Sequence, residues 1–554
     1  MRKTLVLSLM FCVSHLAGSA QSLISSTLIA TYTKQQIDSI YAANGLPAFL
    51  LPVRHDIEIY QLVYETVSYD SSTTFASGAI IIPVGTTCKI PMVSYQHGTI
   101  QKASDAPSFN NGEIIIGIAL AADGYAVSMP DYLGLGITNL PLHPYIHAQS
   151  EATASVDMLI ASRNFMAGMG KEHNGQLFLA GYSQGGHATM ALHRLIEAEL
   201  SQDIQVTASA PMSGPYDVSE TQAQVITNDS VYSQPAFLPF VMFGLNQVYS
   251  FFGNPSNVLD TPYDFTIPPV MNGNFTTGDV NNIMPAIPNE IINPAVLDSF
   301  RTEPNHYFRV ALRDNDVYNW LPVSPIRMFY CEADEQVYYM NAFVAYNQFI
   351  QNGATNVTKV SAGATLDHGG CARIALILGK VWFDSLRTDK ITAAFNIVQE
   401  SAPGSANGSI TANVSGGLQP LSLNWSNGAT GNTITGLTGG TYILTITTAD
   451  SCIVTDTVFV PTVTGMEDLT LTEEQVIIQP NPFHDIAEVK FANPSVAGKI
   501  TEVWLEDLSG RKVQTFDSKE GNKIIIRRNG LSNGIYLLRM RSQGKEVGKK
   551  LLLY

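Results

Sequence analysis

A short stretch around Ser183 has the residue types of a catalytic nucleophile. Residues 177–186 read LFLAGYSQGG, so an apolar run leads into a serine that stands between Gly181 and Gly185. A G-x-S-x-G pattern between a strand and a helix presents the serine hydroxyl on a sharp, strained turn, and glycine is needed on both sides because neighbouring segments pass close. The pentapeptide alone arises often by chance, and a turn serine without a chemical role is the alternative. The strand-like residues before it and the helical pattern after it favour a nucleophile.

A serine hydroxyl is a weak nucleophile until a base takes its proton. In folds that carry this turn, the acid and then the histidine follow the serine along the chain. Asp334 follows the strand-like residues 326–331, and His368 follows the strand-like residues 356–361. We therefore expect Ser183 to be the nucleophile, His368 the base and Asp334 the acid that orients the imidazole. Asp367 is the competing acid, but a residue adjacent to the histidine rarely aligns its side chain with the ring.

The oxyanion of an acyl-transfer intermediate needs two backbone N–H donors. The N–H of Gln184, directly after the nucleophile, is expected to be one of them. The other is expected from the stretch SYQHGTI, which ends a strand that starts at Pro91. Thr99 is preferred there and Gly98 is the alternative, while His97 is expected to be a structural loop residue.

Other polar residues carry weaker signals. Asp131 and Tyr132 follow a further predicted strand and either line the same cleft or close a hydrogen-bonded loop. His143 and His147 are four residues apart, but Pro144 between them breaks the helical spacing of a metal-binding pair. The sequence contains no HExxH motif. We therefore expect no catalytic metal and no cofactor.

The elements that position these residues alternate along residues 21–395. Short apolar strands are predicted at 91–96, 125–131, 177–181, 205–211, 326–331 and 356–361, and helices at 151–168, 186–200, 337–353 and 371–386. Such alternation indicates a mainly parallel sheet with helices on both faces, that is, an α/β fold. Residues 57–84 are expected to add two antiparallel strands.

A long insertion interrupts this alternation at about residues 218–321. Loops between strands and helices usually have about 2 to 6 residues, so this segment is expected to be a subdomain. It contains the apolar stretch PAFLPFVMFGLNQVYSFFG and emerges close to the predicted site. We expect a helical lid, and a small domain of unrelated role is the alternative.

The first residues, 1–20, have the pattern of a cleaved secretory signal, with Arg2 and Lys3 before a short apolar run. A membrane anchor or a lipoprotein is the alternative, and no integral membrane span is expected in the mature chain. Removal of this leader leaves four cysteines, at Cys88, Cys331, Cys371 and Cys452. They allow three complete pairings. If Asp334 and His368 meet, Cys331 and Cys371 are near enough to bridge.

The net charge of −16 is unevenly distributed. Residues 499–554 are basic, so the remainder of the chain is more acidic than the total indicates. An acidic body without a basic face is not expected to bind nucleic acid. The composition changes again near residue 401, where Gly, Thr, Ser and Asn dominate, and two small all-β sandwich units are expected at 396–465 and 466–554.

The motifs HGT, GYSQGG, the insertion after SGPYD, Asp334 and DHGG together resemble the secretory lipase family of α/β-hydrolases, including the fungal lipase A type. The resemblance covers residues 50–386. It implies hydrolysis of carboxylic esters, including acylglycerols, through an acyl-enzyme, with Ser183 as nucleophile, Asp334 as acid and His368 as base. The QHGT stretch departs from the first oxyanion loop of the lipase A type.

The two β units resemble other families. Residues 396–465, with NGSITANVSGG and GLTGGTYILTITTADSC, resemble the SprB-type repeat of gliding-motility adhesins. Residues 466–554, with IQPNPFHD, LEDLSGRKV and NGIYLLRM, resemble the C-terminal sorting domain of type IX secretion. This implies the type IX secretion machinery as a partner, and a location outside a Gram-negative cell or on its outer-membrane surface.

We therefore expect a secreted serine carboxylic ester hydrolase, a lipase or esterase, that acts on a lipid or another ester. A serine peptidase or polyester hydrolase with the same triad is the alternative among enzymes, although the apolar insertion favours an apolar acyl group. A surface adhesin with a vestigial hydrolase domain is the alternative from another class, and a single repeat argues against it.

Overall fold

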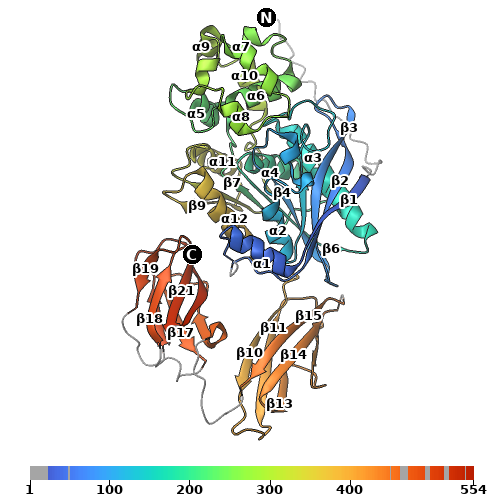
Figure 1. The fold of residues 1–554 in the computed structure, drawn as a ribbon, viewed down its shortest axis with the longest axis vertical. Coiled ribbons are helices and arrows are strands. Elements are labelled where there is room, and N and C mark those ends of the chain that lie inside the picture. Colours follow the sequence, from blue (N-terminus) through green and yellow to red (C-terminus); the bar gives the residue numbers. More distant parts are fainter. Residues whose placement is uncertain are drawn as a thin grey trace, which may run out of the picture.

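The computed structural model describes residues 23–47, 50–449, 451–461, 472–492, 500–516, 523–542 and 545–553. The predicted signal peptide, residues 1–20, lies outside the described residues. Figure 1 shows a large α/β unit followed by two small units built of strands. The predicted α/β fold with two all-β units is therefore confirmed. None of the described helices is long and apolar enough to cross a bilayer.

One nine-stranded sheet organises the α/β unit, in the order β1-β2-β3-β5-β4-β6-β7-β8-β9. The strands are β1 (Leu23–Tyr32), β2 (Ile57–Val67), β3 (Thr73–Pro83), β4 (Ile90–Gln96), β5 (Ala126–Pro130), β6 (His173–Tyr182), β7 (Ala208–Met212), β8 (Ile326–Cys331) and β9 (Val357–Gly363). Strands β5, β4, β6, β7, β8 and β9 are parallel, while β1, β2 and β3 form an antiparallel edge. The carboxyl ends of six parallel strands therefore meet at one edge of the sheet.

Helices cover both faces of this sheet (Figure 1). One face carries α1 (Lys34–Ala43), α2 (Ile114–Ala122) and α12 (His368–Leu386), and the other carries α3 (Ala148–Gly168), α4 (Gln184–Leu195) and α11 (Met340–Gln351). Alternate residues of β6 divide the two cores, since Leu177 and Leu179 face α3 and α4 while Phe178 and Ala180 face α2 and α12. Full burial of a large apolar side chain contributes about 1.5–3 kcal/mol to stability.

The segment between β7 and β8 forms the helical part that lies beyond the sheet in Figure 1. Its helices are α5 (Ala223–Thr227), α6 (Phe237–Tyr249), α7 (Tyr263–Thr266), α8 (Thr277–Asn281), α9 (Pro294–Thr302) and α10 (Tyr307–Asp314). They enclose a separate core in which Phe240 and Leu245 of α6 pack with Phe300 of α9 and Leu312 of α10. The insertion expected at 218–321 is thus helical and has its own core.

The first β unit is a sandwich of two three-stranded sheets. One sheet holds β10 (Thr392–Val398), β11 (Gly408–Ser415) and β13 (Thr433–Leu437), and the other holds β12 (Ser422–Trp425), β14 (Gly440–Thr447) and β15 (Ile453–Val460). Because β10 begins at Thr392 and Phe395 packs on the sandwich core, this unit starts slightly before the boundary predicted between residues 395 and 396.

The last unit is a second sandwich. Its sheets hold β16 (Val476–Gln479), β17 (Ile486–Phe491) and β20 (Lys523–Arg527), and β19 (Lys512–Thr515), β18 (Ile500–Glu506), β21 (Gly534–Ser542) and β22 (Lys545–Leu553). Val489, Leu505 and Leu538 lie in the core between them.

A disulfide joins the first sandwich to the α/β unit. Cys88, in the loop before β4, is bonded to Cys452, directly before β15. The backbone N–H of Ile453 also donates to the hydroxyl of Thr87 at 3.1 Å. This loop lies at the amino end of β4, so the sandwich is attached at the sheet edge opposite to the carboxyl ends of the parallel strands.

We expect this bond to hold the chain together after the backbone is cut within the first sandwich, at a point between Cys88 and Cys452 in the sequence. A protease site inserted in the exposed loop 401–406 would be cleaved to give two fragments. They should migrate as one species on a denaturing gel without reductant, and as two species after reduction. A Cys331→Ser/Cys371→Ser variant is the matched control and should behave in the same way. Fragments that separate without reductant would rule out the Cys88–Cys452 bond.

Candidate active site

Ser183 lies at the turn from β6 into α4, at the carboxyl edge of the sheet. Its backbone has φ 60° and ψ −123°, which a residue with a side chain adopts only under strain. The turn is held by the sheet, since Ser183 N–H donates to the carbonyl of Met212 at the end of β7, at 2.9 Å. The serine hydroxyl is therefore presented above the ends of the strands.

Gly181 and Gly185 are required by close contacts of the backbone. A Cβ added at Gly181 would lie 2.6 Å from the carbonyl oxygen of Gln96, the last residue of β4. A Cβ added at Gly185 would collide with the same oxygen. At Gly181 the carbonyl of Gly185 is closer still, so the two glycines are required by each other as well as by the carboxyl end of β4.

The three residues of the predicted triad lie together. The Oγ of Ser183 is 3.0 Å from Nε2 of His368, and Nδ1 of His368 is 2.9 Å and 2.8 Å from the two carboxylate oxygens of Asp334. Because a carboxylate only accepts hydrogen bonds, Nδ1 carries the proton and Nε2 is left to accept from the serine hydroxyl. All three side chains are buried.

Asp334 and His368 are fixed by their own loops. One carboxylate oxygen of Asp334 accepts from the backbone N–H groups of Gln336 and Val337, at 3.0 and 2.9 Å. The N–H of His368 donates to the carboxylate of Glu335 at 2.9 Å, and its carbonyl accepts from the hydroxyl of Tyr182 at 2.5 Å. The two loops are thus held in contact with each other and with the end of β6.

The sequence left the pairing of Cys331 and Cys371 open, and in the structure they form a disulfide. It joins the end of β8, just before Asp334, to the first turn of α12, just after His368. Asp367, the competing acid, is exposed and caps α12 by accepting from the N–H of Gly370 at 2.7 Å. It therefore orients the helix rather than the imidazole ring.

The loop after β4 carries both expected oxyanion donors, Gly98 and Thr99, and the structure distinguishes between them. The N–H of Gly98 donates to the carboxylate of Glu113 at 3.2 Å, so this donor is engaged in the structure, which favours Thr99 over Gly98. Thr99 remains the candidate from this loop, and its hydroxyl is hydrogen bonded to that of Tyr145 at 2.8 Å. Gln184 is the first residue of α4, so its N–H has no acceptor within the helix.

Glu113 was not identified from the sequence. Its carboxylate also accepts from the hydroxyl of Tyr95 at 2.5 Å, and burial raises its pKa. Glu113 directly precedes α2 and belongs to no recognisable sequence motif. Its role in the structure is to hold the loop that carries Gly98 and Thr99.

Asp131 and Tyr132 form a hydrogen-bonded loop, which decides between the two interpretations of this stretch. The carboxylate of Asp131 accepts from the hydroxyl of Ser77 at 2.5 Å and the N–H of Ser108 at 3.0 Å, and burial raises its pKa. The hydroxyl of Tyr132 donates to the carbonyl of His97 at 3.1 Å. His97 in turn donates from its ring to the carbonyl of Gly98 at 2.6 Å.

His143 and His147 are both buried, and burial lowers the pKa of each to about 4. Nε2 of His143 is 2.7 Å from the side-chain nitrogen of Gln184. Over the residues that the structure describes, no group of three or more His, Cys, Asp or Glu side chains is arranged to hold a metal ion.

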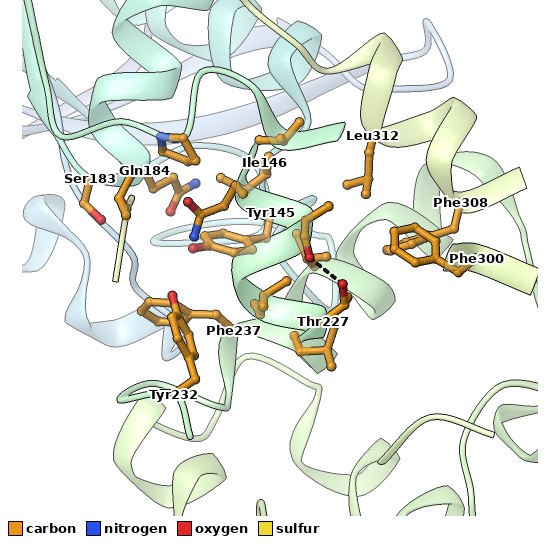
Figure 2. Close-up of a pocket in the computed structure, with 18 residues that line it drawn as sticks. Tyr145, Ile146, Ser183, Gln184, Thr227, Tyr232, Phe237, Phe300, Phe308 and Leu312 are labelled. Carbon is orange, nitrogen blue, oxygen red and sulfur yellow. Dashed lines mark hydrogen bonds between the residues drawn. The ribbon is translucent and has the colours of Figure 1, made fainter. Parts of the chain in front are cut away.

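Ser183 and Gln184 lie at one end of a cavity that extends into the helical insertion (Figure 2). Figure 2 shows Phe300, Phe308 and Leu312 at the opposite end of the view. No lining side chain is charged, and most are apolar or aromatic: Tyr145, Ile146, Pro215, Val218, Gln222, Ala223, Ile226, Thr227, Tyr232, Phe237, Leu238, Val241, Phe300, Phe308, Leu312 and Val337. The apolar stretch around α6 indicated this insertion, but no local pattern showed which of its residues face the serine.

Two regions of the chain match models of known protein families. Residues 103–257 match the family model of the secretory lipases, and residues 477–554 match that of the secretion system C-terminal sorting domain. A search of curated protein sequences gave no match. The resemblance of residues 396–465 to an adhesin repeat stays a prediction.

Solved structures resemble the α/β unit. A protein described as a hydrolase from Legionella pneumophila is 28% identical with a TM-score of 0.62, over 66% of this chain and 98% of that one. The rice cell wall degrading esterase LipA from Xanthomonas oryzae is 26% identical with a TM-score of 0.59, over 67% and 100%. Candida antarctica lipase A in its closed state is 18% identical with a TM-score of 0.50, over 66% and 82%, and shares the fold.

The two matched regions lie in different units, the secretory lipase match in the α/β unit and the sorting match in the last sandwich. A sorting domain of this kind marks a protein that is secreted or attached to the cell surface. The chain is therefore a hydrolase of the lipase/carboxylesterase type that is secreted or attached to the cell surface, with a region that matches the secretory lipases followed by a C-terminal sorting domain.

Proposed function

We propose that this chain hydrolyses carboxylic esters through Ser183, His368 and Asp334, with an acyl-enzyme intermediate. One observation carries the proposal: the hydroxyl of Ser183, on a strained turn, lies 3.0 Å from Nε2 of His368 at the end of an uncharged cavity. We propose a domain organisation of signal 1–20, hydrolase 21 to about 391 with its lid at 218–321, sandwich to 465, and sorting domain 466–554. The type IX secretion machinery is the proposed partner of the last unit.

The first half of the reaction forms the acyl-enzyme. His368 Nε2 takes the proton of Ser183 as Oγ bonds to the ester carbonyl carbon, and the carbonyl electrons move to the oxygen. Asp334 keeps Nδ1 protonated and stabilises the imidazolium. When the tetrahedral intermediate collapses, Nε2 gives the proton to the departing alkoxide. In the second half, water takes the place of the alcohol, and the acid is released with Ser183 restored.

Backbone N–H groups stabilise the oxyanion in this scheme. Gln184 supplies one donor from the start of α4, where the helix dipole also favours negative charge. Thr99 supplies the other, from the loop that Glu113 holds. A donor of this kind contributes about 10²–10³-fold to kcat.

The lining of the cavity favours a substrate whose acyl group is apolar and extends into the insertion. A second cavity adjoins the first, and both are lined by Thr227, Leu238, Phe300 and Phe308. A charged peptide segment would lose its hydration there without a charged partner. We therefore propose an ester of an apolar acid, and a peptidase activity would show as cleavage of an aminoacyl p-nitroanilide instead.

Replacement of Ser183 by Ala removes the nucleophile and should lower kcat for short-chain p-nitrophenyl esters on the order of 10⁶-fold. The measurement is steady-state hydrolysis by purified full-length protein, with thermal unfolding recorded to show that the variant is folded. Ser209, a buried serine of β7 that is paired with Leu179 in the sheet and is not part of the triad, is the matched control, and Ser209→Ala should keep its activity. Near wild-type turnover by Ser183→Ala would exclude this serine as the nucleophile.

The two candidate acids give opposite expectations. Asp334→Asn should lower kcat about 10⁴-fold, because the amide no longer enforces the required tautomer of the imidazole. Asp367→Asn should leave kcat almost unchanged, because asparagine caps a helix about as well as aspartate. The two variants are compared by kcat at neutral pH, and the reverse order of losses would assign the acid to Asp367.

The proposed position of the acyl chain can be tested by a substitution that fills the cavity with a larger side chain. Val241 of α6 lines the cavity, so Val241→Trp should lower kcat/KM for an octanoate ester about tenfold or more, with a smaller effect on an acetate ester. Val231, which is 76% exposed in the same insertion, provides the control Val231→Trp. Equal losses for both esters would show that the acyl chain does not lie in this cavity.

A further inference from the structure

A buried polar cluster lies directly behind the nucleophile. Glu151 of α3 is fully buried, and it faces Gln184 and His187 of α4. His143 completes the cluster from the loop before α3. The mechanism proposed above uses the backbone of Gln184 but none of these side chains.

The side chain of Gln184 is held through its nitrogen. Its Nε2 donates to the carboxylate of Glu151 at 2.8 Å and to Nε2 of His143 at 2.7 Å. His143 is able to accept there because its Nδ1 donates to the carbonyl of Leu133 at 2.8 Å. The Oε1 of Gln184 is buried without a hydrogen-bond partner in the part of the chain that the structure describes. The orientation of the amide therefore depends on Glu151 and His143.

The carboxylate of Glu151 also pairs with His187, which lies one turn after Gln184 in α4. The other carboxylate oxygen of Glu151 is 2.7 Å from Nδ1 of His187, and Nε2 of that ring is 2.8 Å from the carbonyl of Asn315. A carbonyl accepts only, so with an ionised Glu151 the ring donates from both nitrogens as an imidazolium. Burial alone would raise the pKa of Glu151, but the charge and hydrogen bonds of its neighbours, His187 first, outweigh this and lower that pKa.

The same cluster reaches the helical insertion. Asn315 follows α10, the last helix of the insertion, and its side-chain oxygen accepts from the N–H of Ala148 at the start of α3 at 2.8 Å. The ring of His143 stacks on Tyr132 and contacts Phe240 of α6. The start of α4 is thus tied to α3 and to two segments of the insertion.

A buried ion pair is weak evidence for stability, because apolar residues of similar volume often stabilise a protein as well or better. However, Glu151 of the Glu151–His187 pair also accepts from the side chain of Gln184, whose backbone N–H is the proposed oxyanion donor. We propose that Glu151 is a positioning residue, which holds the side chain of Gln184 so that the N–H of Gln184 remains aimed at the oxyanion. This inference rests on the proposed function.

The test compares Glu151→Ala, Gln184→Ala and the double variant with wild type in ester hydrolysis. Each single change should lower kcat about 10- to 100-fold with KM nearly unchanged, because a misaligned donor weakens the transition state and not substrate binding. The double variant should lose no more than the larger single loss, because both residues act through one contact. Additive losses, or losses confined to KM, would overturn the proposal.

Glu151→Gln separates geometry from charge. The new carbonyl accepts from Gln184, and the new amide donates to Nδ1 of a neutral His187 whose Nε2 still donates to Asn315. This variant should recover kcat to within about threefold of wild type, because both hydrogen bonds of the side chain at position 151 are retained. A kcat as low as that of Glu151→Ala would overturn the proposed contact. Asp157→Asn is the matched control, since Asp157 is a buried carboxyl of the same helix that bonds to Thr66, and it should leave kcat unchanged.

Two further measurements keep the outcomes distinct. If Glu151→Ala does not fold, Gln184→Ala decides, because it leaves the Glu151–His187 pair intact, and wild-type kcat in this variant would overturn the inference. Labelling of wild-type protein by a fluorophosphonate, mapped to its peptide, tests the proposed function itself. Labelling at Ser183 together with full activity of Gln184→Ala would reject only the positioning role, whereas a label elsewhere would reject the proposed nucleophile.

Discussion

The strained turn at Ser183 is the constraint on which the rest of the site depends. A backbone of this kind costs on the order of 1–3 kcal/mol, so the surrounding structure must hold it. The sheet does so from both sides, because the carbonyl of Gln96 fills the space beside Gly181 and Gly185 and the carbonyl of Met212 accepts from Ser183 N–H. Parallel strands bring their carboxyl ends to one edge, and this places the loops after β8 and β9 within reach of the turn.

Much of this arrangement could be predicted because its signals are local. The six parallel strands appear as short apolar runs between helical patterns, and Ser183, Asp334 and His368 each follow one of them. Helix α2 was not predicted, because IIIGIALAA is buried on nearly every side and has no polar face to mark its period. Strand β1 and helix α1 were missed as well, since β1 is an exposed edge strand without clear alternation.

The remaining parts of the site arise from contacts between distant segments. Whether Gly98 or Thr99 could donate to an oxyanion depended on Glu113, and no motif links that carboxylate to the loop. The Cys331–Cys371 bond could be foreseen only if Asp334 and His368 met. The cavity lining comes from an insertion whose short helices pack in an order that apolar periodicity does not specify.

The chain thus joins a candidate active site at one edge of the sheet, an uncharged cavity beside it, and a sandwich that is disulfide-bonded to the opposite edge. The most direct test of the account is a crystal structure of the full chain after inactivation by an octyl phosphonate p-nitrophenyl ester. The account predicts a phosphorus–Oγ bond at Ser183, the phosphonyl oxygen on the N–H of Gln184, and the octyl chain among the side chains of α6. Phosphonate bonded to another residue, or no adduct in a protein that still hydrolyses esters, would contradict it.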